Sequence, residues 1–248
     1  MMQTRKTLLV LGGTSDIGRA TALRYAAAGW RVLLTARDAE AGRRSADDIA
    51  TRAGAEVSVH ALDVLDTDSF LSFVDGLPVL PDTVVSVVGE LGDQARAESD
   101  LEHAARVLRA NFEGPALLLG LFAERFAARR SGALVGVSSV AGDRGRGSNY
   151  VYGSAKAGFT AFLSGLRNRL APAGVRVITV KPGFVRTRMT SAMKLPPLLT
   201  AEPSEVGTAI YAAAEGGGGD VIYVRGPWRI VMTVISLLPE KLFKRLRL

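Results

Sequence analysis

Short apolar runs alternate along the chain with longer segments in which apolar residues recur every three or four positions. The strand-like runs are Thr7–Leu11, Arg31–Ala36, Glu56–Ala61, Thr83–Val88, Ala133–Val137, Val175–Val180 and Val221–Val224. The helical segments are Ile17–Ala28, Ala39–Ala53, Asp66–Gly76, Leu101–Arg130 with a break near Gly114-Pro115, Tyr152–Ala171 and Ser204–Glu215. Apolar strands separated by helices predict an α/β fold: a single doubly wound, Rossmann-like parallel sheet with helices on both faces.

The chain has 248 residues and no interdomain linker, which favours one nucleotide-binding domain over 1–226 and a tail over 227–248. The segment Met189–Pro203 lacks a clear period, so we expect a mobile flap there. Without cysteine and with two histidines, the chain offers no thiolate or histidine-rich metal site, and no metal is expected. The net charge of +7 is not accompanied by any nucleic-acid-binding motif, so no nucleic acid is expected as a partner.

The tail carries two apolar stripes separated by Pro239. The first consists of Ile230, Val231, Val234, Ile235 and Leu238 after Trp228, and the second of Leu242, Phe243 and Leu246 beside Lys241, Lys244 and Arg245. Apolar stripes with a basic flank are typical of an amphipathic helix on an anionic membrane. A helix packed on a second subunit or over the functional site is the alternative. Because the stretch Ile230–Leu238 is too short to span a bilayer, we expect a cytoplasmic protein with peripheral contact at the inner face of the plasma membrane.

A glycine-rich loop, Gly12-Gly-Thr-Ser-Asp-Ile-Gly18, joins the first predicted strand to the first helix. Gly12 would allow a tight turn, Gly18 would allow close helix packing, and the helix N-terminus would face a pyrophosphate. Asp16 stands where such loops usually have a glycine. A plain strand–helix connector is the alternative, but the place after the first strand favours dinucleotide binding.

Arg37, at the end of the second predicted strand, bears on the choice of cofactor. An acidic residue there would bind the ribose 2′-hydroxyl of NAD, whereas an arginine accommodates the 2′-phosphate of NADP. We therefore expect NADP(H), with NAD(H) as the alternative if Arg37 is only a surface charge.

Tyr152 and Lys156 lie four residues apart and share one face of a predicted helix. An ammonium beside a phenol favours the phenolate, so we expect the pKa of Tyr152 to fall and its hydroxyl to exchange a proton with a substrate oxygen near pH 7. Ser139 follows the fifth predicted strand and can hydrogen-bond the same oxygen. One of Ser138 and Ser139 must be a turn residue, and the spacing favours Ser139 as the functional one.

These motifs resemble the short-chain dehydrogenase/reductase family from Thr7 to about Val224. The resemblance implies that Tyr152 is the acid–base, that Lys156 also holds the nicotinamide ribose and that Asn111 completes a proton relay; a mere helix irregularity at Asn111 is the alternative. It implies cofactor contacts by Gly12, Thr14, Ser15, Asp16, Ile17, Gly18, Arg37, Asp63, Val64, Gly89, Tyr152, Lys156, Pro182, Gly183, Val185 and Thr187. The family's Asn-Asn-Ala-Gly is Ser86-Val-Val-Gly89 here, which keeps only the glycine.

A narrower set of motifs resembles the reductases of polyprenylphosphoryl 2-keto-sugars, the decaprenylphosphoryl-2-keto-erythro-pentose reductases. These motifs are Gly12–Gly18, Gly89–Asp93, Ser138–Arg144, Ser148–Ser154, Val185–Met189 and the tail. The resemblance implies reduction of an amphiphilic, lipid-linked keto-sugar in arabinan precursor biosynthesis, with a flavin-dependent oxidase as a partner. We also expect a homo-oligomer.

Four arginines are candidates for binding the phosphate of such a substrate: Arg144, Arg146, Arg186 and Arg188. A guanidinium matches phosphate oxygens in pairs, although these arginines could instead be solvated or pair with acids such as Asp143. A soluble reductase of small ketones or 3-oxoacyl thioesters is the alternative enzyme. A non-catalytic nucleotide sensor or scaffold of the same fold is the alternative of another class.

Overall fold

The computed structural model describes residues 5–246; Met1 to Thr4, Arg247 and Leu248 lie outside the described residues. Seven strands form one parallel sheet in the order β3-β2-β1-β4-β5-β6-β9. The strands are β1 (Thr7–Leu11), β2 (Arg31–Ala36), β3 (Val57–Ala61), β4 (Thr83–Ser86), β5 (Ala133–Val137), β6 (Arg176–Pro182) and β9 (Val221–Val224). This sheet confirms the predicted doubly wound α/β fold, and strands such as β1 and β5 are buried along their whole length.

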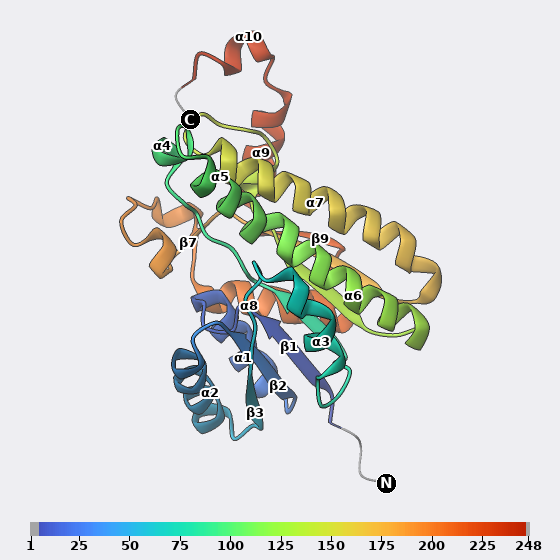
Figure 1. Cartoon of the computed structure of the whole chain (residues 1–248). Coiled ribbons are helices and arrows are strands. Elements are labelled where there is room, and N and C mark those ends of the chain that lie inside the picture. Colours follow the sequence, from blue (N-terminus) through green and yellow to red (C-terminus); the bar gives the residue numbers. More distant parts are fainter. Residues whose placement is uncertain (1–4, 247–248) are drawn as a thin grey trace.

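Helices cover both faces of the sheet (Figure 1). The α-helices of the described residues are α1 (Asp16–Ala26), α2 (Ala39–Ala53), α3 (Phe70–Asp75), α4 (Gln94–Ala97), α5 (Leu101–Leu108), α6 (Gly114–Arg129), α7 (Tyr150–Leu170), α8 (Pro203–Ala212), α9 (Pro227–Leu237) and α10 (Glu240–Phe243). One apolar core joins the sheet to α1, α2 and α8, and a second core joins its other face to α3, α6 and α7. The near-continuous apolar strands of the sequence reflect this burial on both faces.

The sequence predicts a break at Gly114-Pro115 in the helical segment 101–130, but the structure shows no break there. Helix α5 continues into α6 through a π-helical turn at Arg109–Glu113. Pro115 lies just after this π-helical turn, so the irregular turn coincides with the one residue of the segment that has no N–H to donate. Gly114 is required for another reason: a Cβ there would stand 2.0 Å from the carbonyl oxygen of Val64. The irregularity is therefore a wide turn of helix at the position of Asn111.

The segment predicted as a flap has its two ends close together in the structure. Strands β7 (Phe184–Val185) and β8 (Thr200–Ala201) pair in parallel and form a small second sheet at its base. Between them the chain forms two short 3₁₀ turns, at Arg188–Thr190 and Pro197–Leu199. The loop thus projects from the carboxyl end of β6 and borders the crevice described below.

The amphipathic tail packs on the domain through one face of α9. Trp228 and Met232 are buried against Val140, beside Phe184 and Tyr223. The Trp228 indole N–H donates a hydrogen bond to the carbonyl of Leu199, 2.8 Å away. The other face of α9 is open: Ile230 and Leu237 are 71% and 77% exposed. Among residues 5–246, no helix has the length and apolar character needed to cross a bilayer.

Candidate active site

The loops at the carboxyl ends of the strands surround a crevice at the point where the strand order reverses, between β1 and β4. Two cavities meet there at Val87, Val88 and Gly89. The outer groove is lined by residues that include Gly12, Thr14, Ser15, Thr35, Arg37, Asp63, Val64 and Arg188. The inner pocket spans about 860 Å³ including its mouth, and its lining includes Leu91, Ser139, Arg146, Tyr152, Lys156, Thr187, Met193 and Trp228.

The glycine loop forms one wall of the outer groove. Gly12 has a φ of +89°, and its N–H donates to the Thr35 hydroxyl. The Ser15 hydroxyl accepts a hydrogen bond from the Gly18 N–H and so caps the N-terminus of α1. A Cβ at Gly18 would stand 2.4 Å from the Gly12 carbonyl oxygen. These contacts leave a compact polar cradle at a helix N-terminus, which fits a pyrophosphate.

Asp16 is not among the residues that line this groove. Its carboxylate instead accepts hydrogen bonds from the backbone N–H of Arg188 at 2.8 Å and from the Arg188 guanidinium at 3.2 Å. The same guanidinium donates to the Thr14 carbonyl. The aspartate in the glycine position therefore ties the loop after β7 to the glycine loop.

Arg37 is exposed at the end of β2 and lines the outer groove beside Ala36 and Asp63. Its guanidinium forms no ion pair with any residue that the structure describes. Asp63 uses one carboxylate oxygen to accept from the Leu65 N–H, which shapes the turn after β3. The charge of Arg37 is thus available to an anionic group in the groove.

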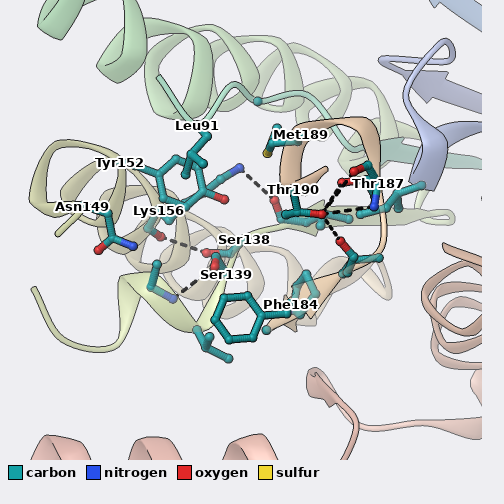
Figure 2. A pocket seen from close by; sticks show the side chains of 18 of the residues that line it. Leu91, Ser138, Ser139, Asn149, Tyr152, Lys156, Phe184, Thr187, Met189 and Thr190 are labelled. Carbon is teal, nitrogen blue, oxygen red and sulfur yellow. Dashed lines mark hydrogen bonds between the residues drawn. The ribbon is translucent and has the colours of Figure 1, made fainter. Parts of the chain in front are cut away.

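Ser139, Tyr152 and Lys156 line the inner pocket together, as the spacing predicted (Figure 2). Ser139 follows β5, and its hydroxyl accepts from the Ala141 N–H at 3.1 Å. The neighbouring Ser138 hydroxyl is engaged with the Lys156 carbonyl at 2.9 Å and the Thr160 hydroxyl at 2.7 Å. Ser138 therefore joins β5 to α7, and Ser139 is the serine next to Tyr152.

Burial, rather than a neighbouring ammonium, dominates the titration of Tyr152. It raises the pKa of Tyr152 to about 12, against a smaller lowering by a hydrogen bond with Ser139. Burial also lowers the pKa of Lys156 to about 8. The Lys156 ammonium donates to the carbonyls of Val137 and Val88 and lies 5.7 Å from the centre of the Tyr152 ring. The predicted fall in the pKa of Tyr152 is thus wrong for this structure, in which the phenol is protonated near pH 7.

Asn111 is buried within the π-helical turn, and its side chain approaches Gly89, which lines both cavities. Its amide N–H₂ donates to the carbonyls of Glu90 and Val107. Its Oδ1 is buried and has no hydrogen-bond partner among the described residues. A Cβ at Gly89 would stand 2.5 Å from this Oδ1 and 3.1 Å from the Lys156 Nζ. The absence of a side chain at Gly89 therefore lets the Asn111 Oδ1 and the Lys156 ammonium approach the same point of the chain. The helix irregularity and the candidate relay residue coincide at Asn111.

The turn after β6 brings Pro182, Gly183, Val185 and Thr187 to the inner pocket, as expected. Figure 2 shows Thr187 and Thr190 on the opposite side of this pocket from Tyr152 and Lys156. The Thr187 N–H donates to the Thr190 hydroxyl, which in turn donates to the Val185 carbonyl. These bonds hold the threonines in place at the edge of the pocket.

The four candidate arginines do not gather around the pocket. Arg144 donates to the carbonyls of Ile235 and Leu238, pairs with Glu240 and stacks on Phe243, so it anchors the tail. Arg186 pairs with Glu202 at the surface, and Arg188 pairs with Asp16. Only Arg146 lines the inner pocket. The prediction of a four-arginine cluster was wrong because the other three find partners that are distant in the sequence.

Several apolar side chains of the inner pocket were not predicted from the sequence. Leu91, Met189, Met193 and Trp228 line it together with Phe184. In the sequence Trp228 stands at the start of the tail stripe, and no local pattern there indicates that it lines the pocket. The pocket is therefore more apolar beyond Tyr152 than the polar motifs indicated.

Comparison with known proteins agrees with this geometry. The family model described as short chain dehydrogenase matches residues 6–196. An uncharacterized oxidoreductase of Streptomyces coelicolor is 39% identical over 97% of this chain and 96% of its own length. A 3-oxoacyl-(acyl-carrier-protein) reductase of Aquifex aeolicus is 31% identical over 76% of this chain and 77% of its own length.

One solved structure that contains a cofactor has an architecture similar to that of this chain. Actinorhodin polyketide ketoreductase with NADPH has a TM-score of 0.79 and 26% identity, covering 90% of this chain and 97% of that one. The matched region includes the glycine loop together with Ser139, Tyr152 and Lys156. It also includes every strand of the main sheet except β9. This chain belongs to the short-chain dehydrogenase/reductase family of oxidoreductases.

Proposed function

We propose that this protein is an NADPH-dependent reductase that converts the ketone of an amphiphilic substrate to a secondary alcohol. The observation that carries the proposal is the shared pocket of Ser139, Tyr152 and Lys156, which opens onto the groove of the glycine loop. At neutral pH the Tyr152 phenol is protonated, so it carries the proton that reduction of a ketone requires.

In the proposed reaction the Tyr152 hydroxyl gives its proton to the carbonyl oxygen of the substrate, and the Ser139 hydroxyl hydrogen-bonds the same oxygen. Lys156, with a pKa near 8, carries its positive charge for most of the time at pH 7 and favours the phenolate that remains. Asn111 and Lys156, whose polar atoms both approach Gly89, are the residues through which a proton would return to Tyr152. When bound, the reduced nicotinamide supplies the hydride, and Gly12, Thr14, Ser15, Arg37, Val64, Gly89 and Thr187 are the residues that would hold the dinucleotide.

The preference for NADPH rests on Arg37 and has its own test. Arg37→Ala should weaken NADPH binding by about tenfold, because one charge-assisted contact with the 2′-phosphate is lost. NADH lacks that phosphate, so its dissociation constant should stay within about twofold. Fluorescence titration with both nucleotides measures this, and Arg43→Ala, an exposed arginine outside the groove, is the matched control. Equal losses for the two nucleotides would reject the preference.

Within this class we propose a lipid-linked 2-keto-sugar as the substrate, consumed in arabinan precursor synthesis after a flavin-dependent oxidase has formed the ketone. The apolar side chains Leu91, Met193 and Trp228 support an amphiphile, because they line the pocket beyond the polar catalytic groups. The second candidate is a 3-oxoacyl thioester, which the name of the Aquifex aeolicus relative favours. Reduction rates of the purified protein with a polyprenylphosphoryl keto-sugar and with a 3-oxoacyl thioester distinguish the two.

The open face of the tail supports contact with a membrane that would hold such a substrate. Ile230, Val234 and Leu237 are exposed on α9, Leu242 and Leu246 are exposed beyond it, and Arg229, Lys241, Lys244 and Arg245 supply positive charge. An apolar face beside basic side chains is the pattern of an interfacial helix. Trp228 and Met232 lie on the buried face of the same helix. Trp228 lines the inner pocket, so α9 also borders the candidate site.

Serine at Ile230, Val234 and Leu237 together should reduce co-sedimentation of the protein with phosphatidylglycerol vesicles by about tenfold, since the apolar face is lost. Binding of the unaltered protein should also weaken as salt rises, because the basic side chains are exposed and screened. Leu101→Ser, at a leucine 83% exposed on α5, controls for a general change in surface polarity. Equal sedimentation of the triple variant and the unaltered protein would exclude the tail as the membrane contact.

A further inference from the structure

Arg146 occupies an unusual place at the wall of the inner pocket. It lies in the loop between β5 and α7, with Gly145 and Gly147 on either side. The loop turns back at this residue, because the Asn149 N–H donates to the Arg146 carbonyl at 3.1 Å. Arg146 thus lines the same pocket as Tyr152 and Met193.

The guanidinium of Arg146 has no counterion among residues 5–246. Its Nε is buried and makes no hydrogen bond there. Asp143, the acid nearest in the sequence, pairs with Lys181 and accepts from the Tyr223 hydroxyl. Glu240, which contacts the same loop, pairs with Arg144. Burial lowers the pKa of Arg146, which reflects the cost of an uncompensated charge in this position. A buried donor without a partner costs stability, so its presence at a pocket wall indicates a ligand that supplies the acceptor.

The phosphates of a dinucleotide cannot be that acceptor. The glycine loop and Arg37 line the outer groove, and Arg146 does not line it. The inner pocket receives instead the groups beside Tyr152, which are the nicotinamide end and the substrate. The anion that meets Arg146 therefore belongs to the substrate.

A second unpaired donor, the side-chain amide of Gln94, lies in a cavity next to the inner pocket. A further cavity, lined by Gln94, Asn149, Tyr152 and Met193, shares the last three of these residues with the inner pocket. The Gln94 side-chain oxygen accepts from the Val151 N–H, whereas its buried Nε2 has no partner among the described residues. The inner pocket, which Arg146 lines, thus adjoins a cavity that offers a neutral N–H donor.

We propose that Arg146, with the Gln94 amide, binds a phosphate group of the substrate on the side of Tyr152 away from the glycine loop. A phosphate offers paired oxygens to the guanidinium fork and a third oxygen to a neutral donor. The inference rests on the proposed reductase function and adds the chemical group by which the ketone is selected. The phosphate of a lipid carrier and that of a phosphopantetheine arm share this chemistry.

Isothermal titration of the protein saturated with NADP⁺ tests the site without turnover. The ligands are geranyl phosphate and geraniol for the lipid source, and pantetheine 4′-phosphate and pantetheine for the thioester source. At least one phosphate should bind about tenfold or more tightly than its neutral partner, as expected for charge-assisted hydrogen bonds. The pair with the larger ratio identifies the source.

Arg146→Gln should remove most of this phosphate preference and leave the neutral ligand within about twofold, because only the charged contact is lost. Gln94→Glu keeps the acceptor for the Val151 N–H, removes the amide donor and adds a negative charge, so it should also weaken the phosphate. Arg186→Gln, which alters an exposed arginine paired with Glu202, should leave the preference unchanged. No phosphate preference in the unaltered protein, or a full preference in Arg146→Gln, would overturn the assignment.

The binding measurement separates this site from the proposed function. In Tyr152→Phe the phosphate preference should persist even though reduction is lost. A protein that binds phosphates through Arg146 but reduces no ketone would refute the reductase proposal alone. A protein that reduces ketones through Tyr152 without any preference would refute the phosphate site alone.

Discussion

Tyr152→Phe should lower the turnover number for ketone reduction by at least about 10²–10⁴-fold, the range that general acid–base catalysis contributes. Only the hydroxyl is removed, and the ring remains packed at the wall of the inner pocket. NADPH should therefore bind within about twofold of the unaltered protein, since the glycine loop and Arg37 are untouched. Steady-state kinetics and nucleotide titration on the same preparation measure the two effects.

Tyr150→Phe is the matched control, because Tyr150 lies on the same first turn of α7 but is 45% exposed and outside the inner pocket. It should keep nearly full activity. If Tyr152→Phe also kept full activity, the assignment of the proton donor would be wrong. Absence of reduction in the unaltered protein with every ketone tested would instead favour the non-catalytic nucleotide sensor.

Lys181→Met should lower the free energy of unfolding by about 3–5 kcal/mol, the range for breaking a buried ion pair from one side. Lys181 at the end of β6 and Asp143 in the loop after β5 form an ion pair whose side chains are each 10% exposed. The Tyr223 hydroxyl of β9 donates to the same carboxylate at 2.9 Å. Methionine would leave this carboxylate buried with one donor. Urea unfolding followed by circular dichroism measures the change.

Two comparisons make this prediction specific. Arg169→Met removes an exposed pair with Glu124 and should cost at most about 1 kcal/mol. Adding Asp143→Asn to Lys181→Met removes the stranded charge and should recover part of the lost stability. A loss in Lys181→Met no larger than that in Arg169→Met would show that the buried pair does not stabilise the fold.

The sequence was sufficient for features that depend on local patterns. Strand boundaries followed the apolar runs to within two residues, and a helical spacing of four placed Tyr152 and Lys156 in the lining of the same pocket. The choice of Ser139 over Ser138 agrees with the hydrogen bonds of Ser138 to α7. In each case the relevant geometry is set by neighbours within one element or one turn.

Features that depend on distant partners could not be predicted in this way. Arg144, Arg186 and Arg188 have long side chains, and their partners Glu240, Glu202 and Asp16 are brought close only by the fold. The pKa of Tyr152 was misjudged for the same reason, because burial by several segments outweighs one neighbour in the sequence.

The contact between Gly183 and Trp228 links positions that evolution would otherwise vary independently. A methyl group at Gly183 would stand 1.9 Å from the indole ring, so no rotation of a small side chain would relieve the overlap. In homologues that carry any other residue at the position of Gly183, the position of Trp228 should hold a smaller side chain. Pairwise substitution statistics across the family should therefore record the docking of the tail, and chimaeras that exchange tails between relatives should work best when both positions are exchanged together.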